Sequence, residues 1–161
     1  MQKSNLTIYC DGGSRGNPGP AASAFVALDD NKVIHKESKY LGIETNNVAE
    51  YAAVLFAVNW LIEQYPISNI QYPIIINLDS QLVERQLNGF YKIKNEKLKK
   101  LADEIKLKID NEVDRVNWKS VTGKPLKIIF KWEYRDKNKL ADSLVNEELD
   151  EIQLRYKNTS R

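Results

Sequence analysis

The sequence Asp11-Gly12-Gly13-Ser14-Arg15-Gly16-Asn17-Pro18-Gly19-Pro20 directly follows the alternating run Leu6-Thr7-Ile8-Tyr9-Cys10. Alternation of apolar and polar residues predicts a strand, and the glycines predict a tight turn whose backbone can approach a ligand closely. Asp11 therefore stands at the end of a strand. Because an acid in this position contributes little to packing, Asp11 is the first candidate functional residue.

Three further acidic residues stand at comparable junctions of the predicted elements. Glu50 lies at the start of an apolar helix, Asp79 closes an isoleucine-rich strand, and Asp142 opens the last helix. Carboxylates that cluster without matching bases usually hold divalent metal, because hard cations prefer oxygen ligands. The four acids together predict a divalent-metal site.

The overall composition is that of a globular protein. The chain has 161 residues, of which 42% are hydrophobic and 29% charged, so we expect a single domain over 1–156 and a loose tail over 157–161. A single cysteine excludes an internal disulfide, and no cluster of thiols or histidines suits zinc. The sequence has no apolar signal core and no run of ~20 apolar residues. We therefore expect a cytoplasmic, monomeric protein that contacts no membrane.

Hydrophobic periodicity predicts an α/β fold with the element order βββαβααβα, in which helices flank a five-stranded mixed sheet. The predicted strands cover 6–11, 21–28, 33–41, 74–78 and 126–132. The predicted helices cover 48–62, a short segment capped by Ser80 and ending at Leu87, 95–109 and 138–156. The polar stretch 110–125 is predicted to be a connection.

Positive charge is concentrated in one part of the chain. Residues 92–108 contain seven lysines and three acids. Such a run can bind nucleic acid through counterion release, and it is equally typical of the solvated face of an amphipathic helix. The sequence leaves both interpretations open.

Five motifs resemble, in order, those of the ribonuclease HI family, in its compact prokaryotic, reverse-transcriptase-like branch. They are CDGGSRGNPGP at 10–20, TNNVAEY at 45–51, LDSQLV at 78–83, QLNGFYKIKNE at 86–96 and NKLADSLVN at 138–146. The resemblance implies a ribonuclease H-like fold. It also implies an endonuclease that hydrolyses the RNA strand of RNA–DNA hybrids and leaves 5′-phosphate and 3′-hydroxyl ends.

The same resemblance identifies Asp11, Glu50, Asp79 and Asp142 as catalytic metal ligands for two Mg²⁺ ions, with Mn²⁺ as a plausible substitute. Each acid taken alone has a simpler interpretation. Asp79 can cap a helix, Glu50 can be a first-turn acid favoured by the helix dipole, and Asp142 can be a solvated acid. The joint pattern favours the metal site.

Discrimination of RNA from DNA requires groups that recognise the 2′-hydroxyl, and amides can both donate to it and accept from it. The resemblance assigns this role to Asn17, Asn46, Asn47 and Gln81. It implies backbone approach to the substrate by Gly12, Gly13 and Ser14, and a grip on a DNA-strand phosphate by Thr45. Helix capping alone is the alternative for the two adjacent asparagines.

Two departures from the family pattern stand out. Many members have a histidine in the loop before the last carboxylate, whereas that loop here is 133–138 and contains none. The single histidine, His35, is expected to be a partly exposed strand residue. Arg135 is a candidate for part of the missing role through its charge, although it cannot act as a base. The basic, Trp-rich insertion of longer relatives is also missing.

Two rival functions fit the same motifs. One is a module that binds hybrids without cutting them, which four acids in register argue against. The other is a metal-dependent nuclease that also acts on double-stranded RNA, since reading 2′-hydroxyls on one strand does not demand DNA on the other.

Overall fold

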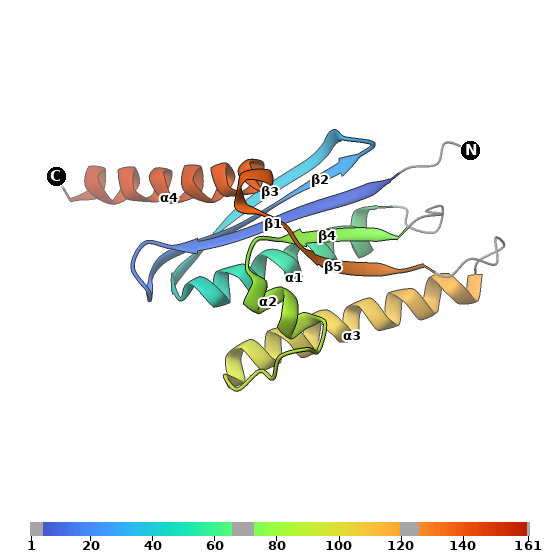
Figure 1. The fold of residues 1–161 in the computed structure, drawn as a ribbon. Helices are drawn as coiled ribbons and strands as arrows, with labels where there is room; N and C mark the ends of the chain where they lie inside the picture. The colour runs from blue at the N-terminus through green and yellow to red at the C-terminus, as the bar shows by residue number, and fades with distance from the viewer. Residues whose placement is uncertain (1–4, 66–72, 120–125, 161) are drawn as a thin grey trace.

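The computed structural model describes residues 5–65, 73–119 and 126–160 (Figure 1). The strands are β1 (Leu6–Ser14), β2 (Gly19–Asp29), β3 (Lys32–Glu44), β4 (Ile74–Leu78) and β5 (Ile128–Trp132). The helices are α1 (Asn46–Gln64), α2 (Gln81–Leu87), α3 (Glu96–Lys119) and α4 (Lys139–Thr159), with a 3-10 turn at Arg135–Lys137. The predicted element order and the five-stranded mixed sheet are confirmed.

The order of strands in the sheet explains why two of the predicted acids meet. The order is β3-β2-β1-β4-β5, with β1, β2 and β3 antiparallel and β4 parallel to both β1 and β5. Cys10 of β1 pairs with Leu78 of β4. The parallel pairing ends at these two residues, so Asp11 and Asp79 follow them at neighbouring positions. The expectation that the strand ends at Asp11 and that a tight turn begins at Gly12 is wrong, because β1 continues to Ser14 and pairs with β2 over this stretch.

Helices cover the two faces of the sheet unequally (Figure 1). Helix α1 packs on one face with α3 outside it, and this side holds the larger core, which includes Ile8, Phe25 and Tyr51. Helix α4 lies on the other face, where Val145 and Leu149 pack against two alanines of β2, Ala22 and Ala24. Small side chains on β2 let α4 lie close to the sheet, next to the end of β1.

Helix α3 is longer than predicted, and the expectation of a connection over 110–119 is wrong. The helix continues from Ile109 to Lys119, while 120–125 lie outside the described residues. Val116 extends the buried stripe, and the 5% exposed Glu112 receives a 2.8 Å hydrogen bond from Nε of Arg115. Because the buried position 112 holds an acid instead of an apolar residue, the apolar spacing typical of a helix is interrupted there. The sequence therefore predicted a polar connection in place of this part of the helix.

Helix α4 runs to Thr159, three residues past the predicted end at Tyr156. The hydroxyls of Thr159 and Ser160 donate to the carbonyl of Tyr156 over 3.1 and 2.9 Å. These bonds satisfy a carbonyl of the last turn, which otherwise has no intrahelical partner. In the part of the chain that the structure describes, no helix is long and apolar enough to span a bilayer.

Candidate active site

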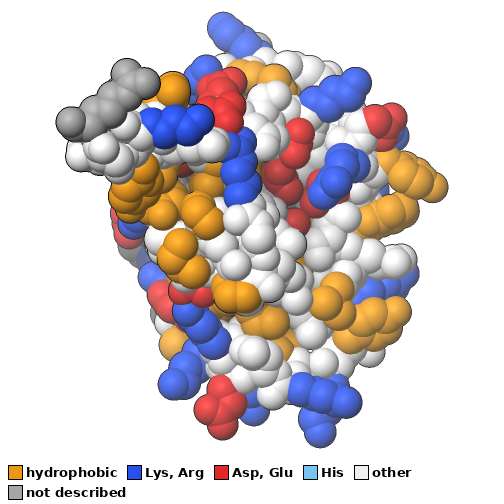
Figure 2. Space-filling model, turned by 90° about the vertical axis from the view of Figure 1, so that its left-hand side faces the viewer, with side chains coloured by type: hydrophobic (Ala, Val, Ile, Leu, Met, Phe, Trp, Pro, Cys, Tyr) orange, Lys and Arg blue, Asp and Glu red, His pale blue; other side chains and the backbone are white. Residues whose placement is uncertain are grey.

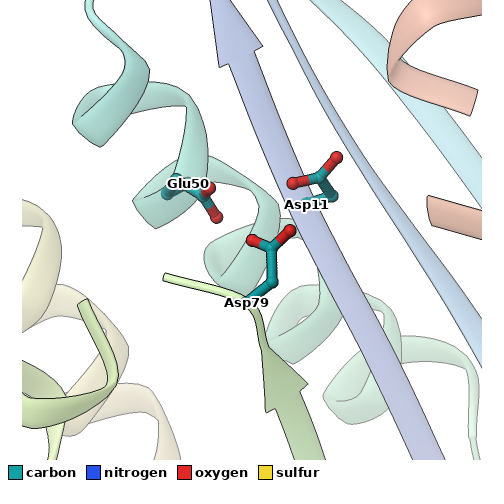
Figure 3. Close-up of side chains that lie close together, drawn as sticks. All are labelled: Asp11, Glu50 and Asp79. Atoms are coloured by element: carbon teal, nitrogen blue, oxygen red, sulfur yellow. The ribbon is translucent and has the colours of Figure 1, made fainter. Parts of the chain in front are cut away.

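Three of the four predicted carboxylates converge at one end of the sheet. Asp11 comes from β1, Glu50 from α1, and Asp79 from the residue that follows β4, and Figure 3 shows their side chains turned toward one another. Each offers an oxygen atom, and these oxygens all lie within 4.8 Å of one another. The arrangement presents hard oxygen ligands from three separate elements to one point in space.

Gly12 lets β1 approach α1 closely enough to bring Asp11 beside Glu50. A Cβ placed on Gly12 would lie 2.1 Å from the carbonyl carbon of Ala49 and 2.3 Å from the amide nitrogen of Glu50. Backbone atoms cannot yield as the end of a flexible side chain does. The glycine that follows Asp11 is therefore required by the contact between strand and helix.

The simpler interpretations of Asp79 and Glu50 do not match their positions. The cap of α2 is Ser80, whose hydroxyl accepts a 3.3 Å hydrogen bond from the Val83 amide. Glu50 lies beyond the first turn of α1 and is 7% exposed. Neither acid is a helix-terminal group facing water.

Asp11 and Glu50 are buried beside other carboxyl groups, so a nearby positive charge would stabilise their ionised forms. Burial, followed by the charges of Asp79 and Asp142, raises the pKa of Asp11 to about 8. Burial and the charges of Asp11 and Asp79 also raise the pKa of Glu50 well above its usual range. Among the described residues, Oε2 of Glu50 is buried without a hydrogen-bond partner. A divalent cation fits this donor set, because it would satisfy the orphaned oxygen and offset the repulsion.

This electrostatic strain predicts how the metal-free protein responds to pH. The carboxyl of Asp11 binds its proton up to about pH 8 in the folded state, but only to about pH 3.9 in the unfolded chain. The folded state then holds more protons between these values, so the contribution of Asp11 makes the free energy of unfolding fall as pH rises from about 4 to about 8, by at most about 6 kcal/mol. The raised pKa of Glu50 acts in the same direction. Thermal unfolding in EDTA across this range measures the effect.

Mg²⁺ should raise the melting temperature most at the alkaline end of that range, where the carboxylates are ionised. The metal-free Asp11→Asn variant should show a flatter dependence on pH, since the group that titrates is gone. A wild-type melting temperature in EDTA that stays constant from pH 4 to 8 would contradict the prediction.

A cleft of about 430 Å³ surrounds the three acids. The sequence-predicted residues that line it are Asp11, Gly12, Gly13, Ser14, Asn46, Asn47, Glu50, Asp79, Arg135 and Asp142. Figure 2 shows acidic side chains recessed in this end of the molecule, with lysines or arginines beside them. Asp142, in the first turn of α4, lines the cleft but stands outside the group of three carboxylates found within the described residues.

Arg135 reaches into the cleft from the 3-10 turn before α4. Its Nε lies 3.3 Å from Oδ2 of Asp79, and its side chain is 81% exposed. A cation so exposed is free to contact a bound anion as well. His35 lies elsewhere, on β3, where its ring stacks on Trp60 at 4.9 Å between centroids. The expectation of a partly exposed strand histidine is confirmed.

Asparagine side chains connect the β1–β2 loop to the start of α1. Oδ1 of Asn46 accepts a 2.8 Å hydrogen bond from the amide of Ser14, and Oδ1 of Asn17 accepts one of 3.1 Å from the amide of Asn46. The hydroxyl of Ser14 donates to the carbonyl of Glu44 over 2.8 Å. These bonds order one wall of the cleft and leave the Asn46 amide NH₂ as a donor.

The remaining predicted substrate contacts differ in position. Asn47 lines the cleft and is half-buried, whereas Thr45 caps α1 by accepting a 3.3 Å hydrogen bond from the amide of Val48. Gln81 is exposed at the first position of α2. Asn17, Thr45 and Gln81 are not among the described residues that line the cleft. Each adjoins a lining residue, Asn17 through its hydrogen bond to Asn46 and the other two as chain neighbours of Asn46 and Ser80.

Sequence reasoning missed the contact that joins the β1–β2 loop to α4. Arg15 forms a 2.6 Å ion pair with Asp150, and its guanidinium also donates to Oε1 of Gln153 and to the carbonyl of Asn146. These partners lie more than 130 positions away in the chain. The only sequence signal was the i, i+4 and i+7 spacing of the three partners on one helix face.

Comparison with known proteins agrees with this geometry. A family model described as RNase H matches residues 3–150. Ribonuclease HI of Halobacterium salinarum is 34% identical over 147 residues, covering 89% of this chain and 63% of the relative. A bifunctional protein of Mycobacterium tuberculosis is 32% identical, covering 90% of this chain and 35% of the relative. A crystal structure of LC11-RNase H1 in complex with an RNA/DNA hybrid has a TM-score of 0.73 at 33% identity, covering 92% and 99% of the two chains.

The chain belongs to the ribonuclease H family. It spans about a third of the length of the mycobacterial relative and about two-thirds of the halobacterial one.

Proposed function

We propose that this protein is an endonuclease that hydrolyses the RNA strand of RNA–DNA hybrids with two divalent ions and leaves 5′-phosphate and 3′-hydroxyl ends. The observation that carries the proposal is the convergence of Asp11, Glu50 and Asp79 within 4.8 Å of one another. A module that only bound hybrids would gain nothing from buried acids that repel one another, so the geometry favours cleavage over the non-cutting alternative.

In this proposal Asp11, Glu50, Asp79 and Asp142 hold Mg²⁺, for which Mn²⁺ can substitute. When bound, such ions supply Lewis-acid activation of a water and stabilisation of the leaving oxygen. Arg135, which lines the cleft and contacts Asp79, contributes positive charge near the scissile phosphate or the departing product. No histidine lines the cleft in the described residues, so no imidazole is given a role.

Substrate choice in this proposal comes from the wall opposite α4. Asn46 and Asn47 face the cleft and contact 2′-hydroxyls, and the backbone of 12–14 allows close approach. At the rim, Asn17 and Gln81 extend the same minor-groove contact, and Thr45 binds a phosphate of the DNA strand. One lysine of α3 lies near this rim, because Lys97 pairs with Glu44, the residue before Thr45.

The proposed functional unit is a single domain over 1–156 that works as a monomer in the cytoplasm. Its support is that one chain supplies all four proposed carboxylates and both walls of the cleft. Sedimentation of the purified chain with and without hybrid tests the monomeric state.

The proposal is tested by incubating the protein with RNA–DNA hybrid, RNA–RNA duplex and DNA–DNA duplex of one sequence, each in Mg²⁺ and in EDTA. We expect Mg²⁺-dependent cleavage of the RNA strand of the hybrid and no cleavage of duplex DNA. Binding of the hybrid without cleavage would establish the non-cutting function, and equal cleavage of RNA–RNA duplex would establish the broader nuclease.

Asn47→Ala should lower kcat/KM on the hybrid by about 5- to 150-fold, which corresponds to the ~1–3 kcal/mol cost of an unsatisfied polar contact. The Tm should change little, because the cap of α1 is made by Thr45. Steady-state kinetics on the hybrid together with thermal unfolding measure both quantities. Unchanged kinetics with a lowered Tm would assign Asn47 a structural role instead.

A further inference from the structure

The segment between β5 and α4 contains a buried asparagine that the proposed chemistry does not use. Asn138 is 1% exposed, and its Nδ2 donates a 2.9 Å hydrogen bond to the carbonyl of Cys10 on β1. Its Oδ1 is buried and has no hydrogen-bond partner among the described residues. The amide is therefore oriented by one bond only, and that bond ends at the residue directly before Asp11.

The backbone of Asn138 links the two cleft residues that flank it in the chain. Its amide donates a 3.0 Å hydrogen bond to the carbonyl of Arg135, and its carbonyl accepts one of 3.1 Å from the amide of Asp142. Both neighbours line the cleft. The side chain of Asn138 thus fixes to β1 the short segment that presents Arg135 on one side and Asp142 on the other.

Attachment of α4 to the sheet does not need this bond. Val145 and Leu149 already pack against Ala22 and Ala24. An unpaired buried oxygen costs about 1–3 kcal/mol, so an apolar side chain would serve packing better than an asparagine. Packing of apolar side chains on small ones leaves a helix freedom to shift along its axis, whereas a hydrogen bond to one carbonyl fixes its start at one position.

We propose that Asn138 is a positioning residue that sets the separation of Asp142 and Arg135 from Asp11 through its bond to the Cys10 carbonyl. The inference rests on the proposed function, because it assigns those three residues to one site. It adds a residue that touches neither substrate nor metal and acts only through its neighbours.

The chain offers a matched control for this bond. Nδ2 of Asn88, at the end of α2, donates a 3.1 Å hydrogen bond to the carbonyl of Phe130 on β5. Like Asn138, Asn88 is an asparagine at a helix end whose Nδ2 donates to a strand carbonyl. Within the described structure, however, Asn88 does not line the cleft. Asn138→Ala and Asn88→Ala therefore each remove a bond from an asparagine to a strand carbonyl. Asn88→Ala also removes a 2.7 Å bond to Oε1 of Glu84, at a more exposed position.

The experiment measures kcat and KM on the hybrid for both variants, the Mg²⁺ concentration for half-maximal rate, and the rise in Tm on adding Mg²⁺ without substrate. For Asn138→Ala we expect kcat to fall about 10- to 100-fold, as for groups that orient metal ligands, with KM within about twofold of the wild type. We also expect a higher Mg²⁺ requirement and a smaller Mg²⁺-induced rise in Tm. Asn88→Ala should keep the wild-type kcat, whatever its Tm.

A second arm tests whether Asn138 acts through Asp142. In an Asp142→Asn background, Asn138→Ala should cause little further loss of kcat, because residues in one network are not additive. If Asn138→Ala fails to fold, Asn138→Leu, which keeps a similar volume but has no N–H donor, replaces it in both arms. A folded variant with wild-type kcat and Mg²⁺ response would overturn the inference. A wild-type protein that does not cleave the hybrid would instead overturn the proposed function.

Discussion

Replacing Asp11 by Asn should lower the rate of hybrid cleavage by more than about 100-fold, because even groups one step removed from a metal cost 10–100-fold when changed. Asp11 is 3% exposed and lies where β1, α1 and the end of β4 meet. The amide keeps the shape of the side chain but removes the charge that would hold a cation. Cleavage in millimolar Mg²⁺ and equilibrium binding of uncleaved hybrid are the measurements.

The binding measurement separates loss of chemistry from loss of structure. Hybrid affinity should stay within a few-fold of the wild type, and the metal-free variant should melt at a higher temperature at pH 8, since one charge of a repelling group is gone. Asp103→Asn, on the exposed face of α3, is the matched control and should cleave normally. Full activity of Asp11→Asn would remove Asp11 from the proposed site.

Much of the site was predictable because short-range signals specify it. Asp11 follows the alternating part of β1 and Asp79 follows β4, and the parallel pairing of these two strands ends directly before both acids. Glu50 was predictable as a position on an apolar helix, although its burial depends on packing against β1. The sequence therefore identified three residues that meet, but of the expected junction positions only that of Asp79 is correct, because β1 continues past Asp11 and α1 begins four residues before Glu50.

The features that escaped prediction have two kinds of cause. The last turns of α3 contain the buried Glu112, which accepts a hydrogen bond from the exposed Arg115 one turn later, and both residues look polar in a sequence. The contact of Arg15 with α4 and the bond of Asn138 to Cys10 join residues more than 120 positions apart. Hydrophobic periodicity depends only on residues close together in the chain, so it cannot show which residues at this range are partners.

Gly12→Ala should lower the free energy of unfolding by on the order of 4 kcal/mol or more. The cost is large because the clash is with backbone atoms, which no rearrangement of side chains can relieve. The new Cβ would meet the carbonyl carbon of Ala49 at 2.1 Å and its oxygen at 2.3 Å. Either β1 or α1 must move away, which opens the larger core and separates Asp11 from Glu50. Activity should fall with stability, because one contact supports both.

Gly13→Ala is the control for this change, since it adds the same methyl group one residue later in the same strand. There the Cβ would lie 3.3 Å from Cγ1 of Val145, the end of a side chain on α4 that can shift by a few tenths of an ångström. We expect its cost to be about 1 kcal/mol, near the low end for overpacking. Urea unfolding of both variants compares the two costs directly. Equal midpoints would mean that β1 and α1 tolerate a side chain between them, and that the glycine after Asp11 is there for the substrate rather than for the fold.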